Sequence, residues 1–291
     1  MENPLVSVII PCYNAEKYVE QAVRSIMNQT YQNLEILISD DCSTDGSFEI
    51  LQKLAEEDAR IKLFRNEYNQ KIVRTLNALV ERASGKYIAR MDADDISLTK
   101  RIEKQVAFLE ANPDIALCGT NALHIDEKGK IIGCSFLATN HEKIQVFKLC
   151  ANPFYHPSVI ARKEILSRYH YDEKFLHAED YALWLNILKS NKGHNIKERL
   201  ICYRIPEKSD SQKCMAQSDL LKTLAPKRSD LKVISRIKPL SARGNIIFSL
   251  ILNHNIKIQD ILRIKFFFPL IFYLLKNFLL LYKRMVNGTW I

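Results

Sequence analysis

The 291-residue sequence lacks the features that define several classes of protein. No two cysteines have C-x-x-C spacing, and the seven cysteines are scattered and odd in number. This pattern argues against a disulfide framework and against a structural zinc site, and it fits a reducing compartment. No signal peptide is visible, because the first apolar segment, Leu5–Ile10, follows the initiator methionine too closely. We therefore expect a cytoplasmic location for at least the N-terminal part.

Glycine and long apolar runs are also scarce. Residues 5–20 contain no glycine, so no glycine-rich phosphate loop follows the first apolar segment. The strongly apolar stretch 266–282 is only 17 residues long and is interrupted by Pro269, Lys276 and Asn277. A spanning helix needs about 20 apolar residues, so a full transmembrane span is not favoured. The hydrophobic content of 47% nevertheless predicts a sizeable buried core.

Positive charge is concentrated in the last quarter of the chain. Residues 222–291 hold 13 lysines and arginines against two aspartates, a local charge of +11, which leaves −2 for residues 1–221. On a helix, Lys265, Lys276 and Lys283 form a narrow basic stripe on a broad apolar face. This pattern is typical of a helix lying in the interface of an anionic membrane. The alternative is a helical subdomain packed on the rest of the protein or in a dimer. Nucleic acid is not expected as a partner, because a Phe/Leu-rich run does not suit phosphate binding.

The first 91 residues alternate between short apolar runs and segments of helical periodicity. This order predicts a mostly parallel sheet with right-handed crossovers. The predicted strands are 5–10, 34–39, 61–64 and 87–91, and the predicted helices are 15–29, 46–58 and 73–83. Further along, we expect a helix at 98–109, a strand at 115–119, a hairpin around 126–129, a helix from 178 to 190, and a last strand ending at Arg204.

Three polar motifs follow predicted strands, and ligands bind beyond the carboxyl ends of such strands. The motifs are Pro11-Cys12-Tyr13-Asn14, Asp40-Asp41 and Asp92-Ala93-Asp94-Asp95. Crowded carboxylates repel one another, and oxygen-rich clusters suit Mg²⁺ or Mn²⁺. The structural alternatives are that the cluster is a solvated acidic turn and that Asp41 is a helix-capping or turn residue. We expect the three motifs to converge in one cleft.

The ordered set of motifs over residues 5–205 resembles glycosyltransferase family 2. The residues that carry the resemblance are Ser7–Asn14, Asp40–Ser47, Gly85–Ile88 leading into Met91–Asp95, Arg101–Gln105, Asn112–Ile115, His156–Val159 and Glu179-Asp180. Members of this family are inverting, nucleotide-sugar-dependent enzymes with the GT-A fold. The resemblance implies an α/β, Rossmann-like sheet flanked by helices.

The resemblance also implies a binding site for a UDP-sugar donor. Pro11 and Tyr13 would flank the uracil, and Asp41 would bond to its edge. Asp92 would lie against the ribose or the donor sugar, and Asp94 would contact the divalent metal, Mn²⁺ or Mg²⁺. The metal would neutralise the diphosphate leaving group. Asp95 is either a further member of the cluster or a cap for the next segment.

On the acceptor side, Asp180 matches the general base of the family. Inversion needs one in-line displacement, so a single base takes the proton of the acceptor hydroxyl, and no covalent glycosyl intermediate is expected. Glu179 and His156 are candidates to line the acceptor side. The alternatives are a structural carboxylate at a helix start for Asp180 and a structural histidine for His156.

The sequence thus predicts an inverting, metal-dependent glycosyltransferase that moves a hexose or N-acetylhexosamine from a UDP-sugar. The expected acceptor is a saccharide, in particular a lipid-linked one in bacterial surface-polysaccharide assembly. The expected organisation is a catalytic domain at 1–206, a linker at 207–230 and a helical, membrane-associating region at 231–291, which places the protein at the cytoplasmic face of the inner membrane. The rival interpretations are a nucleotidyltransferase that makes sugar nucleotides and a non-catalytic sugar-nucleotide-binding protein.

Overall fold

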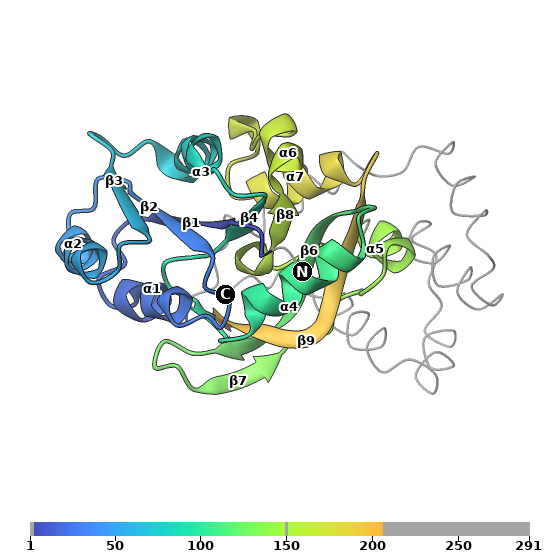
Figure 1. Ribbon diagram of the computed structural model, residues 1–291, viewed down its shortest axis with the longest axis horizontal. Helices are drawn as coiled ribbons and strands as arrows, with labels where there is room; N and C mark the ends of the chain where they lie inside the picture. Colours follow the sequence, from blue (N-terminus) through green and yellow to red (C-terminus); the bar gives the residue numbers. More distant parts are fainter. Residues whose placement is uncertain (1–2, 149–150, 206–291) are drawn as a thin grey trace, which may run out of the picture. The chain divides into compact units, whose positions relative to one another are not determined.

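The computed structural model describes residues 3–148 and 151–205. These residues form one sheet with helices on both faces (Figure 1). Its strands are β1 (Val6–Cys12), β2 (Leu34–Asp40), β3 (Ile61–Arg65), β4 (Tyr87–Arg90), β5 (Ile96–Ser97), β6 (Ile115–Ile125), β7 (Ile131–Cys134), β8 (Ile160–Arg162) and β9 (Lys192–Arg204). Its helices are α1 (Val19–Met27), α2 (Ser47–Glu57), α3 (Lys71–Arg82), α4 (Arg101–Ala111), α5 (His141–Phe147), α6 (Lys163–Arg168) and α7 (Glu179–Ile187), with 3₁₀ turns η1 (His156–Ser158) and η2 (Glu173–Phe175).

The sheet has a parallel half and a mixed half. Its order is β3-β2-β1-β4-β8-β6-β9-β5, and β7 pairs with β6. The strands from β3 to β4 are parallel, as the alternation of strands and helices predicts. Beyond β4, strand β8 is antiparallel to both of its neighbours, β6 and β9 are parallel, and β5 is antiparallel to β9. The sheet as a whole is therefore mixed, and the mostly parallel arrangement is confined to its N-terminal half.

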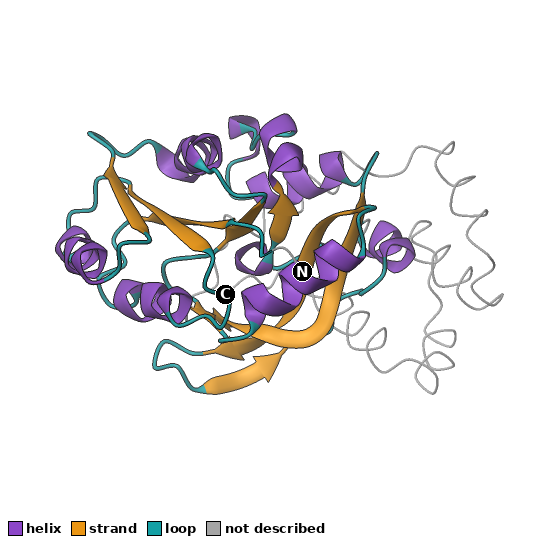
Figure 2. Cartoon of the chain, in the orientation of Figure 1, coloured by secondary structure: helices purple, strands orange, loops and turns teal. Residues whose placement is uncertain are grey.

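Side-chain alternation along the strands builds two apolar layers. In β1, Val8 and Ile10 point into a core made with helices α1, α2 and α4, whereas Ile9 points into a second core made with α3, α6 and α7. Successive side chains of a strand face opposite sides, so a strand covered on both faces has no polar face to expose. Complete burial of a valine or isoleucine side chain contributes about 1.5–3 kcal/mol to the free energy of folding. Figure 2 shows the helices on the two sides of the sheet.

Helix α1 begins later than the sequence predicts. Ala15 to Tyr18 form a turn, in which Tyr18 N donates to Ala15 O at 2.9 Å. The backbone N–H groups of Ala15 and Glu16 donate to Ser47 Oγ at the start of α2 (2.8 Å) and to Asp45 Oδ2 in the β2–α2 loop (3.1 Å). This cross-connection fixes the segment after β1 against the segment after β2, and the helix proper starts at Val19.

The predicted hairpin around residues 126–129 is confirmed, and the strand before it is longer than predicted. Gly129 has a φ of 83°, a left-handed conformation that favours glycine, and its N–H donates to Asp126 O at 3.0 Å. Strand β6 does not stop at Gly119 but continues to Ile125. A glycine is needed at position 119, because a Cβ on Gly119 would lie 2.3 Å from Asn195 Oδ1 on the neighbouring strand β9.

Two predictions lie outside the described residues, namely the linker at 207–230 and the helical region at 231–291. Across the ranges 3–148 and 151–205, no helix combines the length and apolar content that a bilayer crossing requires.

Substituting Gly85 tests how tightly strand β4, which leads into the acidic cluster, is packed against β1. A Cβ at Gly85 would lie 2.7 Å from both Leu5 O and Ser7 N, which are backbone atoms that cannot rotate away. Gly85→Ala is expected to lower the free energy of unfolding by about 1–3 kcal/mol through overpacking, measured by urea denaturation. Gly133→Ala is the control, because its nearest atom, His124 Nδ1, is 3.5 Å away. Equal stability of the two variants would contradict the packing argument.

Candidate active site

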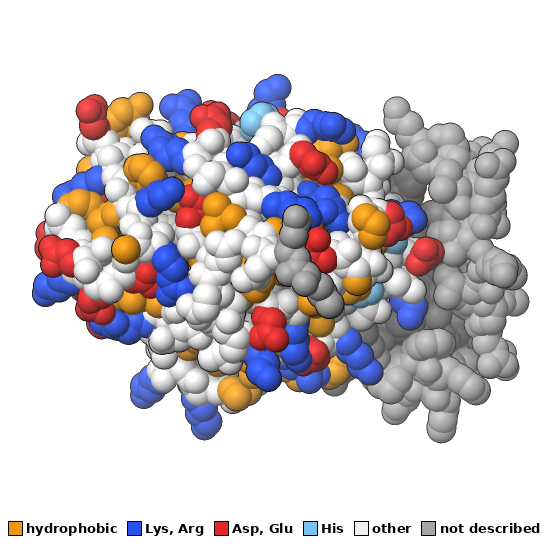
Figure 3. All heavy atoms as spheres, viewed as in Figure 1, with side chains coloured by type: hydrophobic (Ala, Val, Ile, Leu, Met, Phe, Trp, Pro, Cys, Tyr) orange, Lys and Arg blue, Asp and Glu red, His pale blue; other side chains and the backbone are white. Residues whose placement is uncertain are grey.

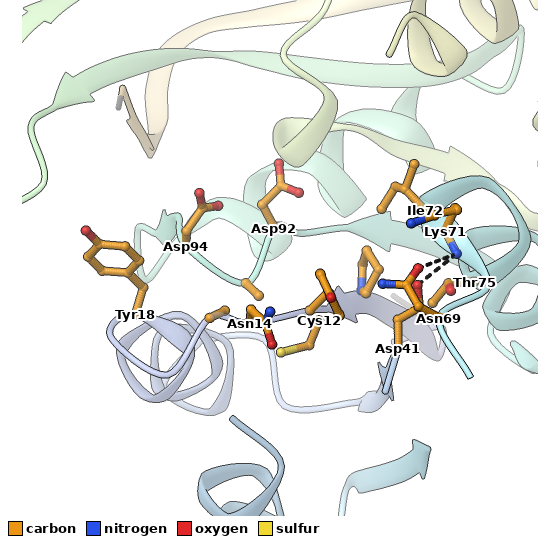
Figure 4. A pocket seen from close by; sticks show the side chains of 14 residues that line it. Cys12, Asn14, Tyr18, Asp41, Asn69, Lys71, Ile72, Thr75, Asp92 and Asp94 are labelled. Carbon is orange, nitrogen blue, oxygen red and sulfur yellow. Dashed lines mark hydrogen bonds between the residues drawn. The ribbon is translucent and has the colours of Figure 1, made fainter. Parts of the chain in front are cut away.

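A pocket of ≈ 410 Å³ opens at the carboxyl ends of β1, β2 and β4 (Figure 4). The three predicted motifs converge there, and five predicted donor-site residues line it: Pro11, Tyr13, Asp41, Asp92 and Asp94. The other lining residues are Cys12, Asn14, Ala15, Tyr18, Asn69, Lys71, Ile72, Thr75 and Ala93.

Asp41 lies at one end of the pocket, where it holds the start of helix α3. Its Oδ1 accepts hydrogen bonds from Asn66 Nδ2 (2.8 Å) and Gln70 N (2.7 Å), and its Oδ2 accepts one from Lys71 N (2.9 Å). Figure 4 marks the bond to Lys71. The first N–H groups of a helix lack partners within the helix, so a buried carboxylate here satisfies them. The helix-capping role considered for Asp41 is therefore present, and Oδ2 retains a lone pair for another donor.

The turn after β1 presents the Tyr13 ring to the solvent side of the pocket. Tyr13 is 49% exposed. The next residue, Asn14, has a φ of 49°, which asparagine tolerates better than most residues. Its N–H donates to Ser43 Oγ (3.0 Å), and its Oδ1 accepts from Thr44 N (2.9 Å). The turn is thus attached to the loop after β2, which fixes Tyr13 while leaving its ring free to stack on a planar ligand.

The acidic cluster forms the opposite end of the pocket. Asp92, Asp94 and Asp95 each offer a carboxylate oxygen, and these atoms lie within 4.8 Å of one another. Asp92 forms an ion pair with Arg90, a buried residue at the end of β4. Asp95 is 1% exposed; its Oδ1 accepts from Arg204 N at 2.7 Å, whereas its Oδ2 has no hydrogen-bond partner among the described residues.

Mutual repulsion and burial raise the pKa values of two of these carboxyl groups. Partial desolvation of the Asp94 carboxyl group, followed by the charge of Asp92, raises the pKa of Asp94 to about 6. The residue as a whole is nevertheless exposed. Burial and the charges of Asp92 and Asp94 raise the pKa of Asp95 well above its usual range. A cation relieves this repulsion. Three oxygen donors, one of them an orphaned buried oxygen, fit Mg²⁺ or Mn²⁺.

Asp180 lies in the first turn of helix α7, outside the lining of the pocket. It is 3% exposed. Its Oδ2 accepts from Asn152 Nδ2 at 2.7 Å, and its Oδ1 accepts from Tyr181 N at 2.7 Å. Both carboxylate oxygens are therefore held in defined positions.

Tyr171 is a buried neighbour of the predicted acceptor-side residue His156. The Tyr171 hydroxyl lies 2.8 Å from His156 Nε2, and both residues are buried. Burial raises the pKa of Tyr171, and the charges of Asp180, Glu179 and Asp92 raise it further. His156 thus contacts Tyr171 directly, whereas Asp180, Glu179 and Asp92 act on it only through their charge, against the opposing charge of Arg90.

Several residues of the site were not singled out from the sequence. Tyr18, Asn69 and Thr75 line the pocket, and Tyr171 lies beside the acceptor-side residues. Arg90 carried a signal that could have been used, because it is a charged residue at the end of an apolar strand directly before the acidic cluster.

The mixed sheet with helices on both faces and the acidic pocket at its edge agree with the expected GT-A architecture. The family model Glycosyl transferase family 2 matches residues 7–169, more than half of the chain. The chain belongs to this family.

Relatives agree with this assignment. The chain is 35% identical over 215 residues to the "UDP-Glc:alpha-D-GlcNAc-diphosphoundecaprenol beta-1,3-glucosyltransferase WfgD" of Escherichia coli, covering 72% of this chain and 81% of that one. It is 34% identical over 221 residues to the "O-antigen biosynthesis glycosyltransferase WbnJ" of Escherichia coli, covering 73% and 84%. The mannosyltransferase PcManGT from Pyrobaculum calidifontis, solved with GDP-Man and Mn²⁺, shares the fold with a TM-score of 0.59 at 18% identity, covering 75% of this chain and 62% of that one.

The elevated pKa of Asp94 makes a prediction about pH and stability. A carboxyl group whose pKa is about 6 in the folded state, against an ordinary value of 3.8, destabilises the fold when it is ionised. That penalty is complete above pH 6 and disappears as the pH falls toward 3.8. Asp94→Asn is therefore expected to raise the melting temperature of the metal-free protein at pH 8, with a gain that shrinks through pH 6 and vanishes near pH 4, as measured by calorimetry in EDTA.

Asp114→Asn is the matched control for this prediction. Lys192 pairs with Asp114 at 2.8 Å and lowers the pKa of that carboxyl group, so the ionised form is favoured in the fold. No gain at pH 8 is expected from this substitution. A pH-independent effect of Asp94→Asn, or equal effects of both substitutions, would refute the repulsion argument.

Proposed function

We propose that the protein is an inverting glycosyltransferase that transfers a hexose or an N-acetylhexosamine from a UDP-sugar to a saccharide acceptor. The observation that carries the proposal is the pocket, which has Asp41 at one end, the acidic cluster at the other and the exposed Tyr13 ring in its lining. Such a pocket suits a nucleoside diphosphate, whose base and diphosphate lie at opposite ends. The name of WfgD, which includes UDP-Glc, supports UDP as the nucleotide.

On the donor side, each residue has a separate task. The Tyr13 ring stacks on the uracil with Pro11 beside it, and Asp41 accepts a hydrogen bond from the base with the lone pair that α3 leaves free. Asp94 holds Mn²⁺ or Mg²⁺, and Asp92 contacts the ribose or the donor sugar. The cation, when bound, neutralises the charge that develops on the diphosphate leaving group.

On the acceptor side, Asp180 accepts the proton of the attacking hydroxyl. The bond from Asn152 fixes one oxygen of Asp180, and the other oxygen is held by the backbone of Tyr181. One positioned base and one displacement invert the configuration at the sugar carbon. Glu179 and His156 orient the acceptor, with His156 held in place by the Tyr171 hydroxyl.

The acceptor is a lipid-linked saccharide in the assembly of a surface polysaccharide such as O-antigen, capsule or exopolysaccharide. The names of WfgD and WbnJ support this proposal, because one contains a diphosphoundecaprenol acceptor and the other O-antigen biosynthesis. A lipid-linked acceptor requires the enzyme to work beside a membrane. The charge of +11 in residues 222–291 supports a peripheral location at the cytoplasmic face of the inner membrane.

Two rivals differ in the chemistry that they require. A nucleotidyltransferase needs a glycine-rich phosphate loop, and residues 5–20 contain no glycine. Membership of glycosyl transferase family 2 also counts against it. The presence of both Asp94 and Asp180, which match the metal contact and the base of the family, counts against a non-catalytic binding protein.

Substituting the proposed base discriminates between catalysis and binding. A screen of UDP-sugars with Mn²⁺ and lipid-linked saccharides first identifies the donor by release of UDP. Asp180→Asn is then expected to lower kcat by about 10²–10⁴-fold, because proton transfer to a positioned base is lost. The dissociation constant for the UDP-sugar, measured by calorimetry, should change little.

Asp172→Asn serves as the control for Asp180→Asn. Asp172 is an exposed carboxylate of the loop before α7, and its Oδ1 accepts from Lys174 N at 2.9 Å, a bond that asparagine can also form. Full activity is expected of this variant. Full activity of Asp180→Asn would exclude Asp180 as the base.

Removing the basic C-terminal quarter tests the proposed location. Each basic residue near an anionic membrane contributes about 1 kcal/mol, so the loss of residues 222–291 should shift the protein from the membrane pellet to the supernatant of lysed cells. A salt wash should release part of the full-length chain, since surface electrostatics are screened by salt. A truncated chain that sediments with membranes as before would contradict the proposal.

A further inference from the structure

Arg204, the last residue of β9, is bonded to the loop that carries the acidic cluster. Its Nε donates to Asp94 O at 2.8 Å, and its backbone N–H donates to Asp95 Oδ1 at 2.7 Å. The register of the sheet explains this contact. Strand β5 pairs antiparallel with β9, with Ile96 opposite Cys202, and extending that register by two residues places Asp94 opposite Arg204.

The same side chain also contacts two other segments. Its Nη1 donates to Asp126 O (2.9 Å) and Glu127 O (3.0 Å) in the β6–β7 hairpin, and its Nη2 donates to Gln21 Oε1 (3.2 Å) in α1. The guanidinium lies 4.3 Å from the centre of the Tyr18 ring. Arg204 is 6% exposed, so these contacts are formed away from bulk water.

Only arginine can form this set of contacts. A planar guanidinium offers several donors in a fixed fork and a flat face for an aromatic ring, whereas the lysine ammonium is a compact point charge. Two of the residues held in this way, Tyr18 and Asp94, line the pocket. Their positions therefore depend on a residue that follows them by more than 100 positions in the chain.

We propose that Arg204 is a positioning residue for the donor site. It fixes the main chain of Asp94 and Asp95 together with the Tyr18 ring, so that the carboxylate oxygens are preset for a divalent cation and a nucleoside diphosphate. The proposal rests on the proposed function for the identity of the ligands. It adds a residue outside the carboxylate cluster that sets the geometry of the cluster through backbone atoms.

The test is the binding of Mn²⁺ in the presence of UDP to the full chain, with free Mn²⁺ measured by electron paramagnetic resonance. Arg204→Met keeps an apolar stem but removes every donor of the side chain, and it is expected to weaken Mn²⁺ binding by about 10–100-fold, as losses of outer-shell partners do. Arg204→Lys restores the positive charge and one ammonium group but not the planar fork of donors, and it should give an intermediate value. The Mn²⁺ concentration for half-maximal activity should rise in the same order.

Arg199→Met is the matched control. Arg199 is on the same strand and also lies over an aromatic ring, 4.9 Å from the centre of Phe136, but among the described residues it forms no hydrogen bond to the loop of the acidic cluster, and Phe136 does not line the pocket. The Arg199→Met protein should bind Mn²⁺ as tightly as the unaltered protein does. Circular dichroism and thermal melting establish that each variant is folded, and if Arg204→Met fails to fold, Arg204→Lys decides.

Each result has a defined meaning. Unaltered Mn²⁺ binding by the folded Arg204 variants, or an equal loss in Arg199→Met, overturns the positioning role. Absence of Mn²⁺ binding in the unaltered protein overturns it as well. If Arg204→Met weakens binding but no donor yields glycosyl transfer, the positioning role stands and the proposed function fails.

Discussion

The constraint on which the site depends is the confinement of three carboxylates within 4.8 Å at the edge of a sheet. The repulsion between three ionised carboxylates at this distance destabilises the fold unless positive charges lie close to them. Three buried arginines provide it from separate elements, Arg90 at the end of β4, Arg101 at the start of α4 and Arg204 at the end of β9. When every group is counted as ionised, the three arginines and three carboxylates balance, yet the raised pKa values of Asp94 and Asp95 indicate that the carboxylates still repel one another. A divalent cation then gives a net positive site, which suits a diphosphate.

Arg101 shows how strongly this charge balance is built into the core. It is completely buried, and burial lowers its pKa to about 9 while the charge of Asp95 acts in the opposite direction. Its Nη1 donates to Arg90 O at 3.2 Å and also to Pro157 O. A buried cation bonded to carbonyl groups, near carboxylates but without an ion pair among the described residues, strengthens the field at the cluster without consuming a carboxylate oxygen. Those oxygens remain available to a ligand.

Sequence reasoning succeeded where function follows local order and failed where it depends on distant pairing. The parallel half of the sheet could be predicted because its strands and helices alternate, and this alternation places Pro11, Asp41 and Asp92 at one edge. The contacts of Arg204 could not be predicted, because β5 has only two residues and its partner β9 lies about 100 residues further on. The bond between Asn152 and Asp180 was equally hidden, since Asn152 belongs to an irregular segment without periodicity.

Asp41 illustrates why a structural and a functional interpretation of one carboxylate need not compete. Three donors from Asn66 and the start of α3 fix its orientation, and the proposed hydrogen bond to the edge of a base needs a fixed orientation. A carboxylate free to rotate would lose conformational entropy on binding, whereas one already held by the protein does not. Asp180 follows the same logic at the start of α7, where Asn152 and the backbone hold both of its oxygens. In this protein, the contacts that make these two carboxylates structural also give them the fixed orientation that their proposed roles require.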